Sequence, residues 1–376
     1  MDYALTEQQE MLRKTSRDFL EKECPKALVR EAEDDEKGYS PDLWKKMAGL
    51  GWMGLVFPEE FGGSGLSYLD LTILLEEMGR ALVPGPFITT ICGGLAIQDW
   101  GSMQQKKKFL PAIARGELKL TLALMESGAT YDPADIAVAA ATEGDEYIVN
   151  GAKMFVPDAH ISDYMLCAVR TKNSARKENG ITLFLIKTRS AGIKVNLLKT
   201  FAADRLCEVV FKNARFPEAG LIGKLNGGWK VVNDILEKSA FATCPWMVGG
   251  AQQVLEASVT YAKERVQFDR PIGSFQAIQH KLANVAIDVA GARDITYQTA
   301  WKLTTGVLCR QDISIAKAWT GEAYRKACAE AIQVHGGVGI TRDYDIQLYY
   351  RRAKSAELAY GDADYHLEMV ARTMEL

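Results

Sequence analysis

The sequence predicts an α+β protein of several domains, in which an N-terminal helical domain and a C-terminal four-helix bundle flank a middle β-domain. Three observations indicate this order. Residues 1–118 carry apolar side chains at helical spacing, residues 119–222 carry short β-branched and aromatic runs between turns, and residues 223–376 return to long helical segments. We expect the β-domain to be barrel-like or sandwich-like. With 376 residues, of which 48% are hydrophobic, the chain has enough apolar material for more than one core.

Helix signals recur through the first domain. Residues 5–21 place apolar side chains on one face of a helix. Ser40 is a plausible N-cap residue, and Pro41 suits the first position of a helix that ends near residue 49. Two further helices are expected over residues 68–82 and 88–100.

The remaining strands and helices are predicted from changes in the spacing of apolar residues along the chain. Strands are expected over residues 120–124, 146–151, 164–169, 181–186, 193–195 and 208–211, where β-branched and aromatic residues cluster. The C-terminal bundle is expected to consist of helices over residues 248–265, 275–305, 313–334 and 348–359, separated by proline and glycine breaks.

Composition excludes several classes of function. A net charge of −3 gives no concentrated basic face for nucleic acid, and no apolar run is long enough for insertion into a membrane. The seven cysteines are scattered without C-x-x-C pairs, and the four histidines lie far apart, so no metal site is predicted. Because such cysteines are typical of a reducing compartment and the charged N-terminal segment is unlike a signal peptide, we expect a cytoplasmic protein.

Three stretches are candidates for ligand binding. Arg265 and Phe268 follow a long helix, where an arginine suits a pyrophosphate and a phenylalanine suits a ring. Residues 333–337 place two glycines after a helix, and residues 155–158 begin with an aromatic ring after a turn. Each stretch also has a plain structural explanation: a surface arginine with a core aromatic, a helix C-cap, and β-core. The chain has no G-x-G-x-x-G fingerprint of a Rossmann dinucleotide site.

The order of these motifs resembles the acyl-CoA dehydrogenase family across essentially the full chain. The resemblance rests on the stretches 44–52, 58–63, 146–154, 264–268 and 333–337 together with the order of the domains. It implies an FAD-dependent enzyme that removes the α-proton of an acyl-CoA thioester with a carboxylate base, while the β-hydrogen leaves as hydride to the flavin. Electron-transferring flavoprotein is the electron acceptor that the resemblance implies, and a dimer of dimers is the implied assembly.

In the family the FAD lies between two subunits, and the resemblance divides the site residues accordingly. The residues that act on the neighbouring subunit's ADP half match in full: Arg265, Phe268, Gln276, Gln333, Gly336 and Gly337. The residues that act on the flavin ring within the subunit do not. Phe155 stands in place of a tryptophan, and Pro157 and Met125 stand in place of threonines. For the acyl-CoA, the resemblance implies contacts from Tyr131, which replaces a serine, and from Phe241 and Gly361.

The base is the largest departure from the family. Tyr360 stands where a glutamate directly before a glycine is usual, and Ser239 stands where some relatives carry the base instead. Asp362, Asp364 and Glu357 are nearby candidates. A neutral tyrosine is a poor base at physiological pH unless its pKa is strongly shifted.

Three hypotheses remain open at this point. In the first, the chain is one subunit of a heteromeric dehydrogenase and donates its ADP-binding residues to a homologous partner that carries the base. In the second, it is a self-sufficient homotetramer with an atypical base. In the third, it binds acyl-CoA, FAD or a partner without catalysis. The pattern of losses favours the first, because the residues that act within the subunit are replaced and those that act on the neighbour are retained.

Overall fold

The computed structural model describes residues 5–128 and 130–375, which form two compact units. Within the described residues, unit 1 comprises residues 5–31, 67–83 and 240–375, and unit 2 comprises residues 32–66, 84–128 and 130–239. The helices are α1 (Glu7–Glu23), α2 (Lys26–Asp34), α3 (Pro41–Gly49), α4 (Tyr68–Ala81), α5 (Phe87–Trp100), α6 (Met103–Ala114), α7 (Gly228–Glu264), α8 (Gln276–Thr305), α9 (Arg310–His335), α10 (Ile346–Leu358) and α11 (Ala363–Thr373).

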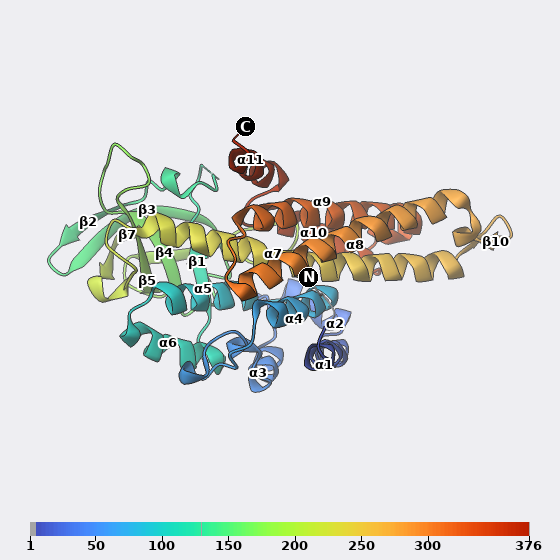
Figure 1. Cartoon of the computed structure of the whole chain (residues 1–376), viewed down its shortest axis with the longest axis horizontal. Coiled ribbons are helices and arrows are strands. Elements are labelled where there is room, and N and C mark those ends of the chain that lie inside the picture. Colours follow the sequence, from blue (N-terminus) through green and yellow to red (C-terminus); the bar gives the residue numbers. More distant parts are fainter. Residues whose placement is uncertain (1–4, 129, 376) are drawn as a thin grey trace. The chain divides into compact units, whose positions relative to one another are not determined.

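Unit 1 is a helical bundle. In Figure 1 the helices α8, α9 and α10 run side by side, joined by short connections, and α11 lies against α9. Helix α4 packs on α1 and α8 through ion pairs in which the carboxylates of α4 are buried and the arginines are partly exposed. Arg17 binds the buried carboxylate of Glu77 through two hydrogen bonds of 2.9 and 2.7 Å, and Arg293 binds Glu76. These bonds give each buried carboxylate the partner that its burial requires.

Unit 2 is built on one mixed β-sheet. Its strands are β1 (Leu120–Ala123), β2 (Ala139–Glu143), β3 (Glu146–Pro157), β4 (Tyr164–Arg170), β5 (Ile181–Lys187), β6 (Ile193–Leu197), β7 (Leu206–Pro217) and β8 (Leu221–Ile222). They pair in the order β6-β7-β3-β2-β4-β5-β8, and β1 pairs with β4 in parallel. Buried residues of β3, β4, β5 and β7 form the core of the sheet, with Phe184, Phe211 and Phe216 at its centre.

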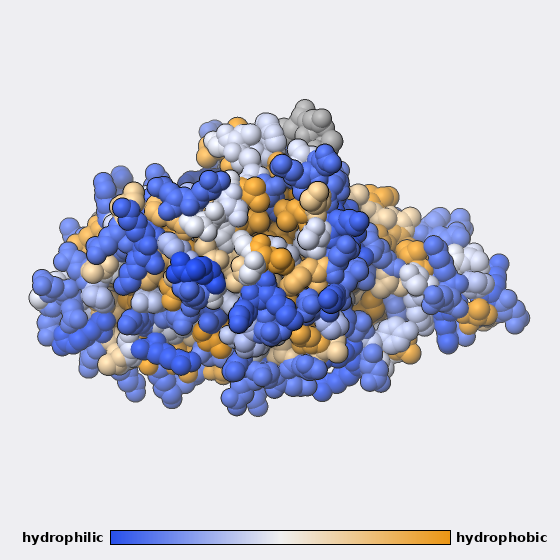
Figure 2. Space-filling view, turned by 90° about the horizontal axis from the view of Figure 1, so that it is seen from below, coloured by the Kyte–Doolittle hydropathy of each residue, from blue (hydrophilic) through white to orange (hydrophobic). Residues whose placement is uncertain are grey.

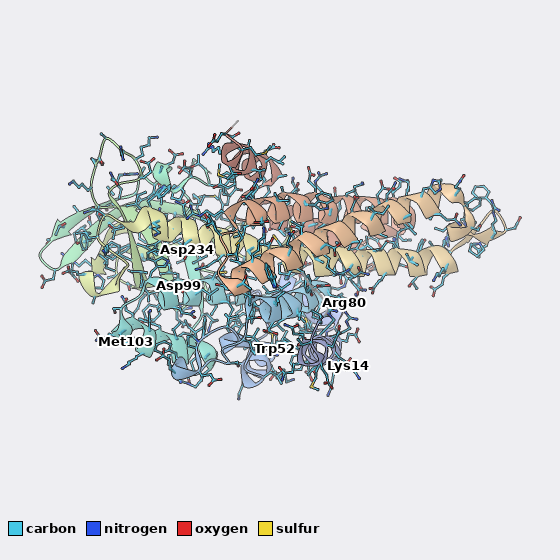
Figure 3. The ribbon with its side chains drawn as sticks, viewed as in Figure 1. Lys14, Trp52, Arg80, Asp99, Met103 and Asp234 are labelled. Atoms are coloured by element: carbon cyan, nitrogen blue, oxygen red, sulfur yellow. The ribbon has the colours of Figure 1, made fainter. Side chains whose placement is uncertain are left out.

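Helices α5 and α7 meet within unit 2 at a group of charged side chains. Figure 3 shows Asp99 and Asp234 close together, one from each helix. Lys238 lies between them and binds Asp234 at 2.8 Å. The indole of Trp100 donates to the same Asp234 oxygen, also at 2.8 Å. Each carboxylate is therefore paired, which explains these conspicuous charges as structural contacts.

The predicted succession of helical, β and helical segments is confirmed, and Ser40 caps α3 through its hydroxyl, which accepts from the Leu43 N–H at 3.2 Å. Helix α7 is longer than predicted, since it begins at Gly228 and carries Pro245 in its interior. The helices α2, α6 and α11 and the strand β2 were not predicted. The predicted middle β-domain is confirmed, and its strands form one continuous sheet. The domain boundaries at residues 118 and 222 stay predictions.

The surface is mixed in character. On the face drawn in Figure 2, hydrophilic residues predominate and hydrophobic residues form small groups among them. Among the helices of the described residues, none is both long and apolar enough to cross a membrane.

Candidate functional site

The loop between α10 and α11 holds Tyr360 in an unusual conformation. Tyr360 has a φ of 58° and Gly361 a φ of 109°, so both lie in the region that favours glycine. Two buried side chains bind the carbonyls of this loop. Lys317 on α9 donates to the carbonyls of Glu357 and Gly361 at 2.9 and 2.8 Å, and His366 Nε2 donates to the carbonyl of Tyr360 at 3.1 Å. These three bonds fix the direction of Tyr360.

Burial shifts the pKa of both supporting side chains. It lowers the pKa of Lys317 to about 8 and that of His366 to about 4. His366 is neutral at physiological pH. Its Nδ1 lies 3.3 Å from the hydroxyl of Ser314, which donates to it when Nε2 carries the proton.

Acid is expected to destabilise unit 1 through His366. Its pKa falls from 6.5 when unfolded to about 4 when folded, so the unfolded chain binds the proton first. Stability is retained above pH 6.5 and lost as the pH falls to 4, by on the order of 3 kcal/mol. Urea unfolding at pH 7 and pH 4 measures this loss. The variant His366→Gln is expected to lose correspondingly less than the natural chain, and an equal loss in both proteins would contradict this role.

The acidic candidates for a base are engaged in structural contacts or are exposed. The carboxylate of Glu357 is buried and binds Arg325 at 3.1 Å and Lys354 at 2.9 Å. Asp362 is the N-cap of α11, because its carboxylate accepts from the Tyr365 N–H at 2.9 Å. Asp364 is exposed in the first turn of α11. Ser239, at the alternative position of the base, is fully buried.

Tyr360 packs against an apolar cluster in unit 1. Phe241 is buried at its centre and meets Tyr68 edge to face at 6.3 Å. The other members of the cluster are Leu69, Ala240, Ala300, Leu303, Cys309 and Ile313. Gly361 admits no side chain, since a Cβ there would lie 2.5 Å from the ring of Tyr365. The structure thus brings three predicted residues, Tyr360, Gly361 and Phe241, into one region.

The predicted ADP-binding residues gather at one end of the bundle. We call Arg265, Phe268, Gln276, Gln333, Gly336 and Gly337 the bundle-end set. They come from the end of α7, the start of α8 and the end of α9. Tyr261 on α7 stacks on His335 of α9 with ring centroids 4.2 Å apart, and Lys281 on α8 binds Glu330 of α9 at 2.5 Å. These contacts join the three helix ends, and every member of the set is exposed.

The tip of the α7–α8 hairpin displays Phe268. The short strands β9 (Val266–Gln267) and β10 (Arg270–Pro271) are joined by Phe268 and Asp269, whose φ angles are 54° and 63°. Asparagine and glycine are the usual residues in such a turn. The turn leaves Phe268 87% exposed, held only edge to face against Phe275 at 6.0 Å. An exposed aromatic ring on a strained turn is a feature typical of a binding surface.

A bulge in β3 turns Phe155 outward in unit 2. The pairing of β3 with β7 shifts register between Lys153 and Val156, and Phe155 has a φ of 54° and is 43% exposed. Met154 donates its N–H to the Met125 carbonyl at 2.9 Å, which ties β3 to the segment after β1. The carbonyl of Pro157 accepts from the Thr121 hydroxyl. Phe155, Pro157 and Met125 therefore belong to adjoining segments of unit 2.

A cavity of about 270 Å³ lies beside this region and is lined in part by Met125 and Tyr131. Its wall is fixed by Glu126, which accepts from the N–H groups of Ala137 and Val138 at 3.0 Å each. The same carboxylate accepts from the fully buried Lys153 at 2.6 Å. This rigid wall makes the cavity a candidate binding site for a small molecule.

Comparisons with known proteins agree along the whole chain. Residues 6–117, 121–214 and 226–375 match the N-terminal, middle and C-terminal domains described for acyl-CoA dehydrogenases. The probable acyl-CoA dehydrogenase YngJ of Bacillus subtilis is 31% identical, with 100% of both chains covered. The chain belongs to the acyl-CoA dehydrogenase family. This is a family of FAD-dependent flavoproteins whose members are oxidoreductases.

Two further relatives bear on function. The 3-(aryl)acrylate reductase of Clostridium sporogenes is 31% identical over 98% of this chain and 99% of its own. The structure of the ChsE4-ChsE5 complex from Mycobacterium tuberculosis contains a chain that superposes with a TM-score of 0.90 at 26% identity, covering 100% of this chain and 99% of that one. The family therefore includes a protein named as a reductase and a complex of two differently named chains.

The residues present fit one half of FAD better than the other. At the bundle end, a Cβ placed on Gly336 or Gly337 would meet open space, so both backbones are accessible to a ligand, and Arg265 suits a pyrophosphate. Around the flavin ring, neither Pro157 nor Met125 has a side chain that donates a hydrogen bond. Only Phe155 offers a surface for the ring, through packing.

Sequence reasoning missed the residues that support the site. Lys317, His366, Lys153 and Glu126 are buried or partly buried polar groups that hold loops in place. Lys317, His366 and Lys153 lie in helices or a strand and Glu126 lies in a loop, all positions where charged residues are ordinary. The one available signal was a lysine within a largely apolar strand, as at Lys153. Among residues 5–128 and 130–375, no group of histidine, cysteine, aspartate and glutamate side chains could hold a metal ion.

Proposed function

We propose that this chain is a subunit of a heteromeric FAD-dependent acyl-CoA dehydrogenase. In this proposal the bundle-end set binds the ADP half of an FAD whose flavin ring lies in a homologous partner subunit. The partner supplies the carboxylate base. The carrying observation is the contrast between an intact, exposed bundle-end set and a loop that presents Tyr360 where the base would stand.

The contacts within the chain support this division of roles. Glu357 is held in ion pairs and Asp362 caps a helix, so neither is free to approach a substrate without breaking a structural contact. Pro157 and Met125 give the flavin ring no side-chain donor. A bound flavin would supply the hydride-accepting chemistry for the β-hydrogen of the acyl group. This chain would then contribute binding, orientation and the exclusion of water.

We also propose partners and a location for this chain. Electron-transferring flavoprotein is the proposed electron acceptor, and an acyl-CoA thioester is the proposed substrate. Reduction of an enoyl-CoA is the same reaction in reverse, and a relative named as a 3-(aryl)acrylate reductase makes both directions worth assaying. A cytoplasmic location is proposed because all seven cysteines are buried thiols without disulfides.

The test begins with the chain purified alone, incubated with FAD and passed through gel filtration. We expect that no acyl-CoA from a panel of short, long and aryl-substituted thioesters bleaches any bound flavin. Co-expression with a homologue that carries the glutamate is expected to give a complex that is bleached. Replacing that glutamate by glutamine should then reduce turnover by roughly 10³-fold or more, the upper part of the range for general-base catalysis.

Tyr360→Phe separates the remaining hypotheses. Its hydroxyl is removed while its ring is kept, so the complex should retain turnover within about twofold. If the chain alone dehydrogenates acyl-CoA and Tyr360→Phe or Asp364→Asn slows it, the homomeric hypothesis with an atypical base replaces this one. If no homologue forms a complex and no flavin binds, the chain is a non-catalytic member of the family.

A further inference from the structure

A second cavity in unit 2, of about 680 Å³, has a strongly basic lining. It lies among the loop before α3, the start of β1, the turn between β3 and β4 and the end of β5. Its cationic residues are Lys37, Lys119, Lys187 and Arg189, with His160 beside them. None of the residues predicted to bind FAD or acyl-CoA lines this cavity.

Hydrogen bonds fix the walls of this cavity. Asp163 N–H donates to the Lys119 carbonyl at 2.9 Å, and Lys119 N–H donates to the Asp163 carboxylate at 2.8 Å. Thr188 N–H donates to the Asp163 carbonyl at 3.0 Å. His160 Nε2 contacts the carbonyls of Glu36 and Lys37 at 3.0 and 3.1 Å and so holds the loop before α3. The backbone segments that carry the basic side chains are therefore held in place before any ligand binds.

The charges in the cavity are not balanced. The lining has four lysine and arginine side chains but only two carboxylates, Glu36 and Asp163. Asp163 is paired with Lys119 at 3.5 Å. Within residues 5–128 and 130–375, no carboxylate lies within ion-pair distance of Lys37, Lys187 or Arg189. This local excess of positive charge occurs in a chain whose net charge is −3.

We propose that this cavity binds a phosphorylated small molecule. Lysine and arginine are the side chains that bind phosphate oxygens most strongly. One Nη of Arg189 donates a hydrogen bond to the His160 carbonyl at 3.3 Å. The remaining guanidinium donors are available to a ligand. A volume of about 680 Å³ suits a molecule the size of a nucleotide. The site is separate from the proposed dehydrogenase function and does not depend on it.

His160 provides an internal reporter of binding. Burial lowers its pKa, and the nearby cations of Arg205 and Arg189 lower it further. A bound phosphate opposes those cations, so the pKa of His160 should rise when the site fills. A proton NMR titration, with the His160 resonance assigned from the His160→Asn spectrum, measures this change with and without ligand.

The test uses pyrophosphate and ATP as probes at low ionic strength, with affinity measured by calorimetry on the full chain carrying Arg265→Glu, so that the bundle-end set does not contribute pyrophosphate binding. The double variant K187Q/R189Q is expected to weaken binding by roughly tenfold or more and to abolish the rise in the pKa of His160. Both side chains are exposed, so the thermal midpoint should not change. The matched control K194Q/K212Q removes two exposed lysines from β6 and β7 outside the cavity and should leave binding unchanged.

Three results would overturn the proposal. One is that neither probe binds. Another is equal weakening by the control variant, which would show attraction to net charge alone. The third is binding that persists in K187Q/R189Q, or that leaves the pKa of His160 where it was, since the ligand would then lie elsewhere.

Discussion

Replacing Gly249 by alanine is expected to prevent α7 from packing against α4, with a loss of about 4 kcal/mol or more of the free energy of unfolding. A Cβ at Gly249 would lie 1.8 Å from the carbonyl oxygen of Glu76. The contact is reciprocal, because a Cβ at Gly79 would lie 1.9 Å from the carbonyl oxygen of Trp246. The obstacle in each case is backbone, which cannot rotate away as a side chain does. The cost should therefore exceed the 1–3 kcal/mol typical of overpacking.

The consequence for the fold is large, because domains are stabilised by only about 5–15 kcal/mol in total. Urea unfolding followed by circular dichroism measures the loss. Gly49→Ala is the matched control, since Gly49 ends α3 and a Cβ there would meet nothing within 4 Å. That control should leave stability unchanged or raise it slightly. A Gly249→Ala protein as stable as the natural chain would mean that the two helices are not in backbone contact.

Some of the helices that the sequence predicted have both apolar side chains on one face and a capping residue. α3 and α4 are examples, since Ser40 and Ser67 each accept from a backbone N–H of the first turn. The start of α7 was missed because Pro245, which lies inside this helix, resembles a break before the predicted helix of residues 248–265. Tertiary packing overrides that local preference, since Gly249 is needed where α7 meets α4.

Other elements were missed because their own sequences give only a weak signal. Strand β2 has the sequence Ala139–Glu143, three of whose residues are alanines, which have low β-propensity. It forms because β3 offers an antiparallel partner along its whole length. Helix α6 contains Pro111 near its end, and α2 is only nine residues long. Pairing and packing decide these cases, and neither is visible in a single segment.

The candidate site divides in the same way. The bundle-end set could be predicted because its residues follow helices in an order that resembles the family, and contacts between α7, α8 and α9 bring those helix ends together. The hydrogen bonds that hold the Tyr360 loop could not be predicted, because Lys317 lies 43 residues earlier in the chain and binds only backbone carbonyls. No sequence pattern predicts that a side chain will bind backbone carbonyl groups, because every residue has one.

Arg265→Glu is the substitution expected to affect the proposed heteromer most. Arg265 is exposed and has no side-chain ion pair among the described residues, so its removal costs the isolated chain little. In the complex it would bind the pyrophosphate of FAD. Loss of that charge-assisted bond, together with the repulsion of a new carboxylate, should weaken FAD binding by roughly 100-fold.

The measurement is the flavin absorbance that the co-expressed complex retains after gel filtration, which does not depend on turnover. Lys263→Glu is the matched control, because Lys263 is exposed in the last turn of α7, two residues before Arg265, and gives the same change of charge. It should leave flavin retention unchanged while Arg265→Glu removes most of it, with equal thermal midpoints for the two isolated chains. If both complexes keep their flavin, the bundle end of this chain does not bind the cofactor. The retained flavin would then be held by the partner subunit alone, and the division of roles proposed for the two subunits would be wrong.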